Sequence, residues 1–347
     1  MATMIDVARQ ARVSVSTVSH VINGTRHVEQ ATRKRVLDAI EATGYRQDTL
    51  ARAMRRSRSD SIGLVLSDVG EPAFAEMIHG VESAAAEHGL TLILANSAED
   101  SDREKRAVQA LLNRRVDGLV LASAAISDRG LLEELQGEKA PTVLLDRVYP
   151  ELDFDQVGAN NRETMYALAS QLISQGHARF LVVAGDLRVP TLRERHDGFT
   201  EAVAAGGLRT EDQHILSSDE GSPRPVPDIE AVRKALTLSR PTAVIASSTP
   251  LAAVALRALA AEGLRIPEDL AFAAFDGFDN SDLFEPQITT VRQPAFEMGR
   301  TAVGLLIDRL EKPSTSHRTV RLKQRIDWRS STRTENVVAP EHDAGLA

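Results

Sequence analysis

The sequence contains no cysteine, and Phe, Trp and Tyr together make up only 4% of its 347 residues. The absence of cysteine excludes disulfide bonds, thiolate zinc sites, iron–sulfur clusters and cysteine nucleophiles. The composition is otherwise ordinary for a folded protein, with 42% hydrophobic and 26% charged residues. A chain of this length can form two or three domains, each with its own core.

Long apolar segments are also missing. The longest uncharged apolar stretch, residues 241–256, is interrupted at residues 247–250 and is shorter than the ~20 apolar residues that span a bilayer. The N-terminal segment carries Asp6 and Arg9, where a signal peptide would be apolar. We therefore expect a cytoplasmic protein that does not contact a membrane.

The sequence lacks the short motifs of common enzymes. It has no phosphate-binding loop, dinucleotide fingerprint, nucleophile elbow or His-Glu-x-x-His motif. Its nine His residues show no metal-ligand spacing. We expect no catalytic residue, no metal and no cofactor.

Charge is distributed unevenly along the chain. Residues 1–60 contain 11 Lys and Arg against 6 Asp and Glu, whereas the other 287 residues contain 30 and 43. A basic head on an acidic body favours a head that binds a polyanion and a body that the polyanion repels.

Residues 3–44 have the pattern of three short helices. Thr3 and Asp6 have the spacing of a capping box, and Ser14 can cap a second helix. The third helix, residues 29–43, presents Val36, Leu37 and Ile40 on one face and ends at Gly44.

The second of these helices has short hydroxyl and imidazole side chains where Lys and Glu are usual. A helix–turn–helix places such a helix in the major groove of DNA, with its first residues at the base edges. Short hydroxyls let the helix approach phosphates closely, and His20 can bond to a base edge as donor or acceptor.

Residues 45–60 are polar and basic, and they join this head to the rest of the chain. Leu50 and Met54 form an apolar pair at helical spacing. Because about eight residues do not hold a helix alone in water, we predict a helix that forms only under some conditions, against the alternative of a disordered linker.

From residue 61 the pattern changes to apolar runs that alternate with amphipathic helical stretches. Such runs predict parallel strands joined by crossover helices, arranged as two doubly wound lobes with a ligand cleft at the carboxyl ends of the strands. The predicted strands are 62–67, 90–96, 117–123, 141–146, 179–185, 214–218, 242–248 and 270–276.

The segment "TMIDVARQARVSVSTVSHVINGTRHVEQATRKRVLDAIEATGY" strongly resembles the head of the LacI family of bacterial transcription repressors. Body segments such as "RVDGLVL", "RERHDGF", "IPEDLAFAAFD" and "ITTVRQPAFEMGRTAVGLL" extend the resemblance. It implies an all-α helix–turn–helix domain (1–46), a hinge helix and linker (47–60), and an α/β effector and dimerisation domain (61–340). The two lobes of that domain would be 61–160 with 292–322, and 161–291 with 323–340.

The resemblance also assigns DNA contacts. Base readers would be Val15, Ser16 and His20. Phosphate contacts would come from hydroxyl, amide and phenol groups: Thr3, Ser14, Thr17, Ser19, Asn23, Thr32 and Tyr45. The hinge in the minor groove would include Leu50, Ala51, Arg52 and Met54, with Met54 where most members have a Leu that wedges between base pairs. Gln47 replaces a Pro of the family pattern, which predicts a looser hinge.

The effector site implied by the resemblance comprises Phe74, Asn160, Thr191, Arg195, Thr249 and Asp276. Asn160 and Thr249 stand where many members have Asp, and Trp328, the only Trp, is far from these positions in sequence. The loss of two carboxylates argues against a neutral sugar held by many carboxylate–hydroxyl bonds, and it favours a phosphorylated or acidic effector.

The function that the resemblance implies is a ligand-responsive transcriptional repressor. It would bind a near-palindromic operator in double-stranded DNA as a homodimer, since the C-terminal segment has no Leu heptad for tetramers. A sugar, sugar phosphate or nucleoside-like molecule would change its DNA affinity. The alternative is a cytosolic sugar-binding receptor with no operator function.

Overall fold

A computed structural model describes residues 2–24, 26–45, 58–124, 129–218, 227–278 and 283–333. The chain divides into two compact units, Met1–Ser59 and Asp60–Ala347, and each is considered by itself. The predicted hinge residues Leu50, Ala51, Arg52 and Met54 lie outside the described residues, as does the segment from 334 onward.

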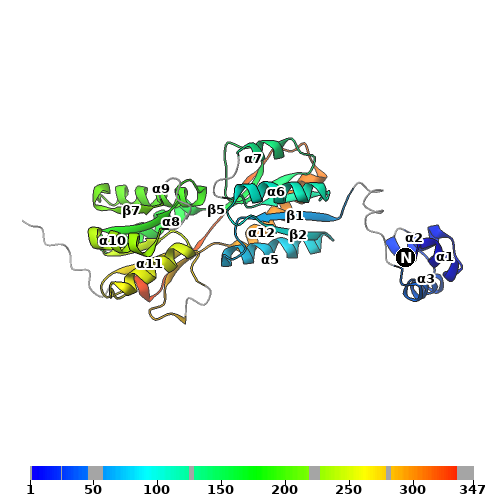
Figure 1. The fold of residues 1–347 in the computed structure, drawn as a ribbon, viewed down its shortest axis with the longest axis horizontal. Coiled ribbons are helices and arrows are strands. Elements are labelled where there is room, and N and C mark those ends of the chain that lie inside the picture. Colours follow the sequence, from blue (N-terminus) through cyan, green and yellow to red (C-terminus); the bar gives the residue numbers. More distant parts are fainter. Residues whose placement is uncertain are drawn as a thin grey trace, which may run out of the picture. The chain divides into compact units, whose positions relative to one another are not determined.

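The first unit is a bundle of three helices, α1 (Met4–Ala11), α2 (Val15–Asn23) and α3 (Gln30–Thr43) (Figure 1). Their shared core consists of small apolar side chains: Val7, Ala8, Ala11, Val18, Val21, Val36 and Ala39. The predicted caps are confirmed at Thr3, Ser14 and Gly44.

The helix face predicted to contain Val36, Leu37 and Ile40 is not uniformly buried. Leu37 is 50% exposed, whereas its neighbour Val36 is fully buried. The buried stripe of α3 runs through Val36 and Ala39, and Leu37 lies about 100° around the helix from Val36. Leu37 therefore points away from α1 and α2.

The second unit begins with a lobe built on a parallel sheet in the order β11-β5-β4-β3-β1-β2. The strands are β1 (Ser61–Leu66), β2 (Thr91–Asn96), β3 (Gly118–Leu121), β4 (Thr142–Asp146), β5 (Asp155–Ala159) and β11 (Thr319–Leu322). Its helices are α5 (Pro72–Glu87), α6 (Ser101–Asn113), α7 (Arg129–Gln136) and α12 (Ala295–Glu311). We call this the N-lobe.

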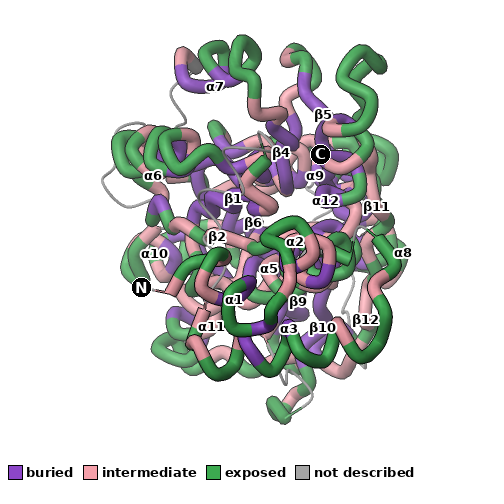
Figure 2. The backbone as a smooth tube through the Cα atoms, turned by 90° about the vertical axis from the view of Figure 1, so that its right-hand side faces the viewer, coloured by how far each residue is buried: buried purple, intermediate pink, exposed green. Residues whose placement is uncertain are grey.

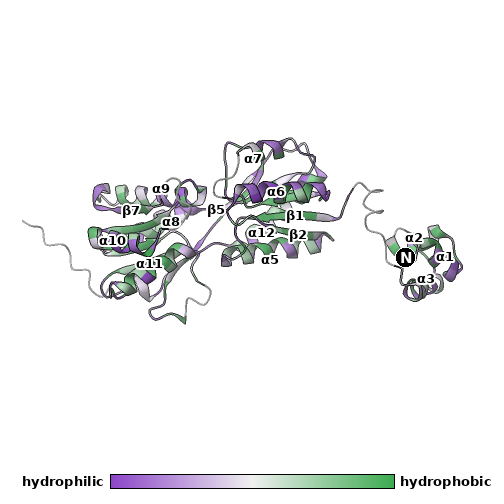
Figure 3. Ribbon diagram, viewed as in Figure 1, coloured by the Kyte–Doolittle hydropathy of each residue, from purple (hydrophilic) through white to green (hydrophobic). Residues whose placement is uncertain are grey.

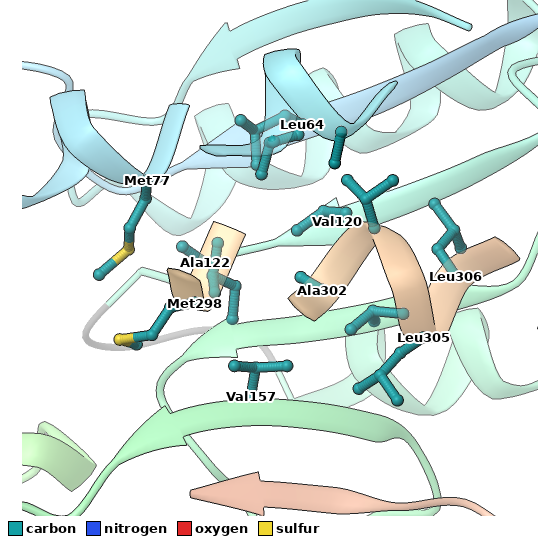
Figure 4. Close-up of a cluster of buried hydrophobic side chains, with 14 of the residues drawn as sticks. Leu64, Met77, Val120, Ala122, Val157, Met298, Ala302, Leu305 and Leu306 are labelled. Atoms are coloured by element: carbon teal, nitrogen blue, oxygen red, sulfur yellow. The ribbon is translucent and has the colours of Figure 1, made fainter. Parts of the chain in front are cut away.

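Helices cover both faces of the N-lobe sheet. α5 and α12 pack on one face, where Met77 and Met298 meet side chains of β1, β3 and β5 (Figure 4). α6 and α7 cover the other face through Val108, Leu111 and Leu131. Figure 3 shows hydrophobic β1 and β2 beside the hydrophilic outer surface of α6.

The other lobe, the C-lobe, has the sheet order β12-β10-β9-β8-β6-β7. Its strands are β6 (Phe180–Gly185), β7 (His214–Ser217), β8 (Ala243–Ala246), β9 (Ala271–Phe275), β10 (Thr289–Arg292) and β12 (Arg325–Asp327), of which β12 is antiparallel to β10. Its α-helices are α8 (Asn161–Ser174), α9 (Pro190–Ala205), α10 (Ile229–Ser239) and α11 (Thr249–Ala261), with short 3-10 turns η1 (Thr210–Asp212) and η3 (Ser330–Thr332). α8 and α9 cover one face, and α10 and α11 cover the other.

The prediction of two doubly wound parallel lobes is confirmed, and each of the eight predicted apolar runs contains a strand. The run-based pattern missed β5, β10, β11 and β12 because each has polar residues within it. β5 is fully buried all the same (Figure 2), and Asp155 in it is paired with Arg309 at 2.8 Å. A polar residue can occupy a buried strand when a distant side chain satisfies it.

The candidate ligand site lies where the chain crosses between the two sheets. The chain passes from one sheet to the other between β5 and α8, between β10 and α12, and between β11 and β12. The loops after the parallel strands and the first turns of the helices that follow therefore face a common cleft. Among the described residues, no helix is long and apolar enough to cross a membrane.

Candidate functional site

The first candidate site is the start of α2 in the head. The chain enters it through Arg12, whose left-handed backbone (φ 53°) ends α1. α1 is itself fixed by a capping box, in which the Thr3 backbone N–H donates to Asp6 at 2.9 Å and the Asp6 N–H donates to the Thr3 hydroxyl at 3.3 Å. The hydrogen bonds from Thr3 lower the pKa of Asp6.

Three hydroxyl groups gather at the first turn of α2. The Ser14 oxygen accepts from the Thr17 N–H at 3.1 Å and lies 2.8 Å from the hydroxyls of both Ser16 and Thr17. The first turn of α2 has no acidic residue. A helix N-terminus with free N–H groups, hydroxyls and no carboxylate is suited to bind a phosphate.

Val15 is exposed beside these hydroxyls. It is 42% exposed, whereas Val18 and Val21 of the same helix are buried in the head core. An exposed Val at the start of a recognition helix can contact the methyl group of thymine. Ser16 is also exposed, and His20 is half-buried one turn further along.

The other predicted phosphate contacts are spread over the head. The Thr3 hydroxyl donates to Asp6 at 2.7 Å, and the Thr32 hydroxyl accepts from Arg35 at 3.2 Å. Ser19 is half-buried, and Tyr45 packs against the head core. The side chain of Asn23 lies outside what the structure describes.

The second candidate site is a cavity of about 290 Å³ between the two lobes. Of the six predicted effector residues, it is lined by Phe74, Thr191, Arg195 and Asp276. Asn160 and Thr249 are not among its described lining residues. The charged lining residues that the sequence analysis did not assign are Asp68, Glu71, Glu99, Asp146 and Arg147.

Arg195 is buried and fully engaged. Its guanidinium pairs with Asp276 at 3.1 Å and 3.5 Å, donates to the carbonyl of Ser247, and donates through Nε to Asn161 at 2.9 Å. It also lies 4.4 Å above the ring of Phe275. The guanidinium is therefore a fixed part of the wall, and a ligand meets the Arg195–Asp276 pair as one unit.

Asn161, the neighbour of the predicted Asn160, holds this arrangement in place. Its side-chain oxygen accepts from Arg195, and its amide nitrogen donates to Glu194 at 3.1 Å. Asn160 is the residue before α8, and its carbonyl accepts from Thr164. The Thr249 hydroxyl donates to the carbonyl of Gly277 at 2.8 Å, at the start of α11.

Asp146 and Asp276 occupy equivalent local positions in the two lobes. Asp146 is the last residue of β4 and Asp276 directly follows β9, and their backbones are left-handed, with φ of 71° and 64°. The signal that identifies Asp276, an Asp closing an apolar run, is also present in "PTVLLD". It could have identified Asp146 from the sequence.

The pKa values of two carboxyls in this cavity, Glu71 and Asp146, are raised. Burial, and then repulsion from Asp276, Asp146, Asp68 and Glu99, raises the pKa of Glu71 to about 7. Burial raises the pKa of Asp146 to about 6, against the opposing influence of Arg147 and Arg195. Both carboxyls hold protons more tightly than an isolated side chain does.

The described lining of the cavity differs from the residues on which the expectation of an acidic effector depended. That expectation depended on the absence of carboxylates at Asn160 and Thr249, and neither is among the described lining residues. The described lining contains five carboxylates and two guanidinium groups, Arg147 and Arg195. Both guanidinium groups are already paired, Arg147 with Glu99 at 2.6 Å and Arg195 with Asp276.

A helix–turn–helix head joined to a two-lobed ligand-binding body defines a DNA-binding regulator that responds to a small molecule. Residues 3–48 match the family described as "Bacterial regulatory proteins, lacI family". Residues 59–329 match "Periplasmic binding proteins and sugar binding domain of LacI family". The protein belongs to the LacI family, as the sequence resemblance predicted, and it is a transcriptional regulator and not an enzyme.

Individual relatives agree with this assignment. The HTH-type transcriptional repressor PurR of Aliivibrio salmonicida is 33% identical over 95% of this chain and 99% of its own length. The HTH-type transcriptional repressor CytR of Escherichia coli K12 is 32% identical over 89% of this chain and 90% of its own. The solved structure of the transcriptional regulator CelR–cellobiose complex has a TM-score of 0.69 and 31% identity, covering 95% of this chain and all of that one.

Proposed function

We propose that this protein represses transcription in the cytoplasm as a homodimer that binds a near-palindromic operator, and that a small molecule in the cleft between its lobes changes its DNA affinity. The domain boundaries are proposed at residues 46 and 60, with the effector domain beginning at 61. The observation that carries the DNA-binding role is the exposed Val15 beside the hydroxyls of Ser14, Ser16 and Thr17.

On the DNA side, Val15, Ser16 and His20 would contact base edges. Phosphate contacts would come from the residues around them: Thr3, Ser14, Thr17, Ser19, Asn23, Thr32 and Tyr45. Leu50, Ala51, Arg52 and Met54 would form the hinge in the minor groove. The basic excess of residues 1–60 supports this assignment, because it supplies the electrostatic part of DNA affinity.

On the effector side, Phe74 would stack on a ring face of the ligand, and the Arg195–Asp276 pair would bond to its hydroxyls. Thr191, at the first turn of α9, would add a further polar contact. The CelR relative is described in complex with cellobiose, which supports a sugar-like ligand for the cleft. Ligand binding would be coupled to operator binding by about 1–3 kcal/mol.

Replacing Val15 by Ala tests the recognition helix. Because Val15 is exposed, stability should change by less than about 0.5 kcal/mol. Specific operator affinity should fall about tenfold or more as the contact with a base is lost, while affinity for random DNA stays the same. Fluorescence anisotropy with operator fragments selected from genomic DNA measures both affinities.

Leu37→Ala is the matched control, because Leu37 is also an exposed apolar residue of the head but lies on α3. It should leave both affinities unchanged. Equal losses in the two variants would contradict the assignment of α2. A receptor without operator function would show no sequence preference, and its DNA binding would not fall steeply as salt rises.

A further inference from the structure

The two walls of the cleft differ in charge. The N-lobe wall contributes Asp68, Glu71, Glu99 and Asp146 against the single guanidinium of Arg147 among the described lining residues. The C-lobe wall contributes Arg195 and Asp276, which neutralise each other. The negative charge of the cleft is therefore concentrated on one side.

Within the N-lobe wall, most carboxylates have no cationic partner. Arg147 is occupied by Glu99, through contacts of 2.6 Å and 3.2 Å, and also donates to the carbonyl of Ser123. Asp68 accepts a backbone N–H from Gly70 at 2.8 Å. Glu71 precedes α5 without capping it. Asp68, Glu71 and Asp146 form no ion pair within the described part of the chain.

The C-lobe wall offers hydrogen-bond donors. α9 begins after Val189 without a side-chain cap, and its first internal bond is made by the Arg193 N–H to the Val189 carbonyl at 3.0 Å. The N–H groups of Thr191 and Leu192, which line the cavity, precede that bond. A helix N-terminus of this kind accepts the oxygen atoms of a ligand.

One acceptor of the C-lobe wall is also without a partner. Gln293 lines the cavity and donates to Asp276 at 2.8 Å, but its buried oxygen Oε1 has no hydrogen-bond partner in the described part of the protein. A buried acceptor without a partner is unfavourable, and a donor group on a ligand would remove that cost.

We infer that the effector is a hydroxylated amine, such as an amino sugar, whose ammonium group faces Glu71 and Asp146 while its hydroxyls face the first turn of α9 and Gln293. An ammonium supplies the positive charge that the N-lobe wall lacks, together with three donors. An anionic ligand would instead meet uncompensated carboxylates. The inference depends on the proposed function, because it names the ligand of the same cleft.

The raised pKa values of two carboxyls in the N-lobe wall agree with this assignment. The pKa of Glu71 is raised to about 7 by burial and repulsion from the neighbouring carboxylates, and burial raises that of Asp146 to about 6 although Arg147 and Arg195 oppose the shift. A bound ammonium would stabilise both carboxylates in their ionised form.

The test uses the full-length protein and matched amine and hydroxyl ligands on the same carbon skeleton. Glucosamine and glucose, galactosamine and galactose, and glucose 6-phosphate as the anionic probe are titrated calorimetrically. At least one amine should bind about tenfold more tightly than its hydroxyl counterpart, and the phosphate should bind most weakly. In the combined variant Glu71→Gln, Asp146→Asn, the amine should lose this advantage over its hydroxyl counterpart.

Glu76→Gln, an exposed carboxylate of α5 outside the cavity, is the charge-matched control and should keep the preference. The inference is overturned if amine and hydroxyl partners bind equally, if the phosphate binds best, or if no amine binds. Operator binding is measured on the same preparations. Sequence-specific DNA binding that a neutral sugar releases would leave the proposed function intact while this inference fails.

Discussion

At the scale of single residues, the cleft shows that a side chain's role depends on its neighbours. Asp146 and Asp276 have the same local backbone at the ends of equivalent strands. Asp276 is bonded to Arg195 and Gln293, whereas Asp146 forms no ion pair in the described region and its pKa is raised to about 6. One carboxylate thus organises the wall, and the other is available to a ligand.

Replacing Asp276 by Asn should destabilise the protein markedly. The guanidinium of Arg195 is 3% exposed, and the variant leaves its charge buried without a counter-charge. The free energy of unfolding, measured with urea, should fall by about 3 kcal/mol. Ligand binding should weaken as well, because the wall loses its fixed geometry.

The control for this prediction is Glu262→Gln. Glu262 pairs with Arg233 at 2.5 Å on the surface of the C-lobe, where water screens the interaction. Its loss should cost less than about 1 kcal/mol. Similar losses in both variants would show that burial of the Arg195–Asp276 pair does not decide its contribution.

At the scale of elements, the contact between α5 and α12 depends on glycine. A Cβ atom on Gly299 would collide with the backbone carbonyl of Met77, and one on Gly80 with that of Phe296. The two helices therefore cross with their backbones almost in contact. Met77 of α5 and Met298 of α12 belong to the hydrophobic cluster drawn in Figure 4. No local pattern in either helix indicates this, because the partner lies far away in sequence.

Two glycines of α12 provide a matched pair of substitutions. Gly299→Ala should lower the free energy of unfolding by about 1–3 kcal/mol, because the backbones must separate. Gly304→Ala has open space around its Cβ and should raise it by about 0.5–1 kcal/mol, because Ala favours the helix. Thermal unfolding of both variants checks the signs, and a stabilising Gly299→Ala would refute the close crossing.

At the scale of the whole molecule, the DNA-binding part and the ligand-binding part of the chain differ in the sign of their net charge. The basic excess lies in residues 1–60, and the acidic excess lies in the remainder, which includes the carboxylates of the cleft. A negative body disfavours nucleic-acid binding at the ligand cleft, whereas the basic excess of residues 1–60 favours it at the N-terminal end of the chain.

The stability of the whole protein should depend on pH through Glu71. Its pKa is about 7 in the folded protein and 4.5 for the free side chain, so the folded state binds this proton more tightly. That contribution is fully present below about pH 4.5 and is lost as the pH rises through 7. Relative to Glu71→Gln, the wild type should lose on the order of 1–3 kcal/mol of unfolding free energy between about pH 5 and pH 8.

Urea titrations of the two proteins at several pH values measure this difference, in which the contributions of titratable groups distant from Glu71 cancel. Glu76→Gln serves again as the control, and its free energy of unfolding should change with pH in the same way as that of the wild type. A difference that stays constant across this range would mean that Glu71 is not crowded by the other carboxylates of the cleft.

Sequence reasoning was most successful where the determinants are local. Capping at Thr3 and Ser14 depends on residues three positions apart, and buried parallel strands depend on continuous apolar runs. β5 was missed because its polar residue Asp155 is satisfied by Arg309, which is distant in sequence. Leu37 was placed wrongly because a helix face is decided by the position of its partners.

The sequence by itself determined the class of fold, the capped recognition helix and the family, since all of these are encoded in short contiguous segments. Only the tertiary structure decided the chemistry of the cleft. Glu71, Asp146, Arg195, Asp276 and Gln293 come from different strands, loops and helices, and folding brings them to one cavity. The pKa values of Glu71 and Asp146 depend on the burial and the neighbours that folding gives them. The strength of an electrostatic interaction depends on the distance between the groups and on their burial. Neither the distance nor the burial can be read from the order of residues along the chain.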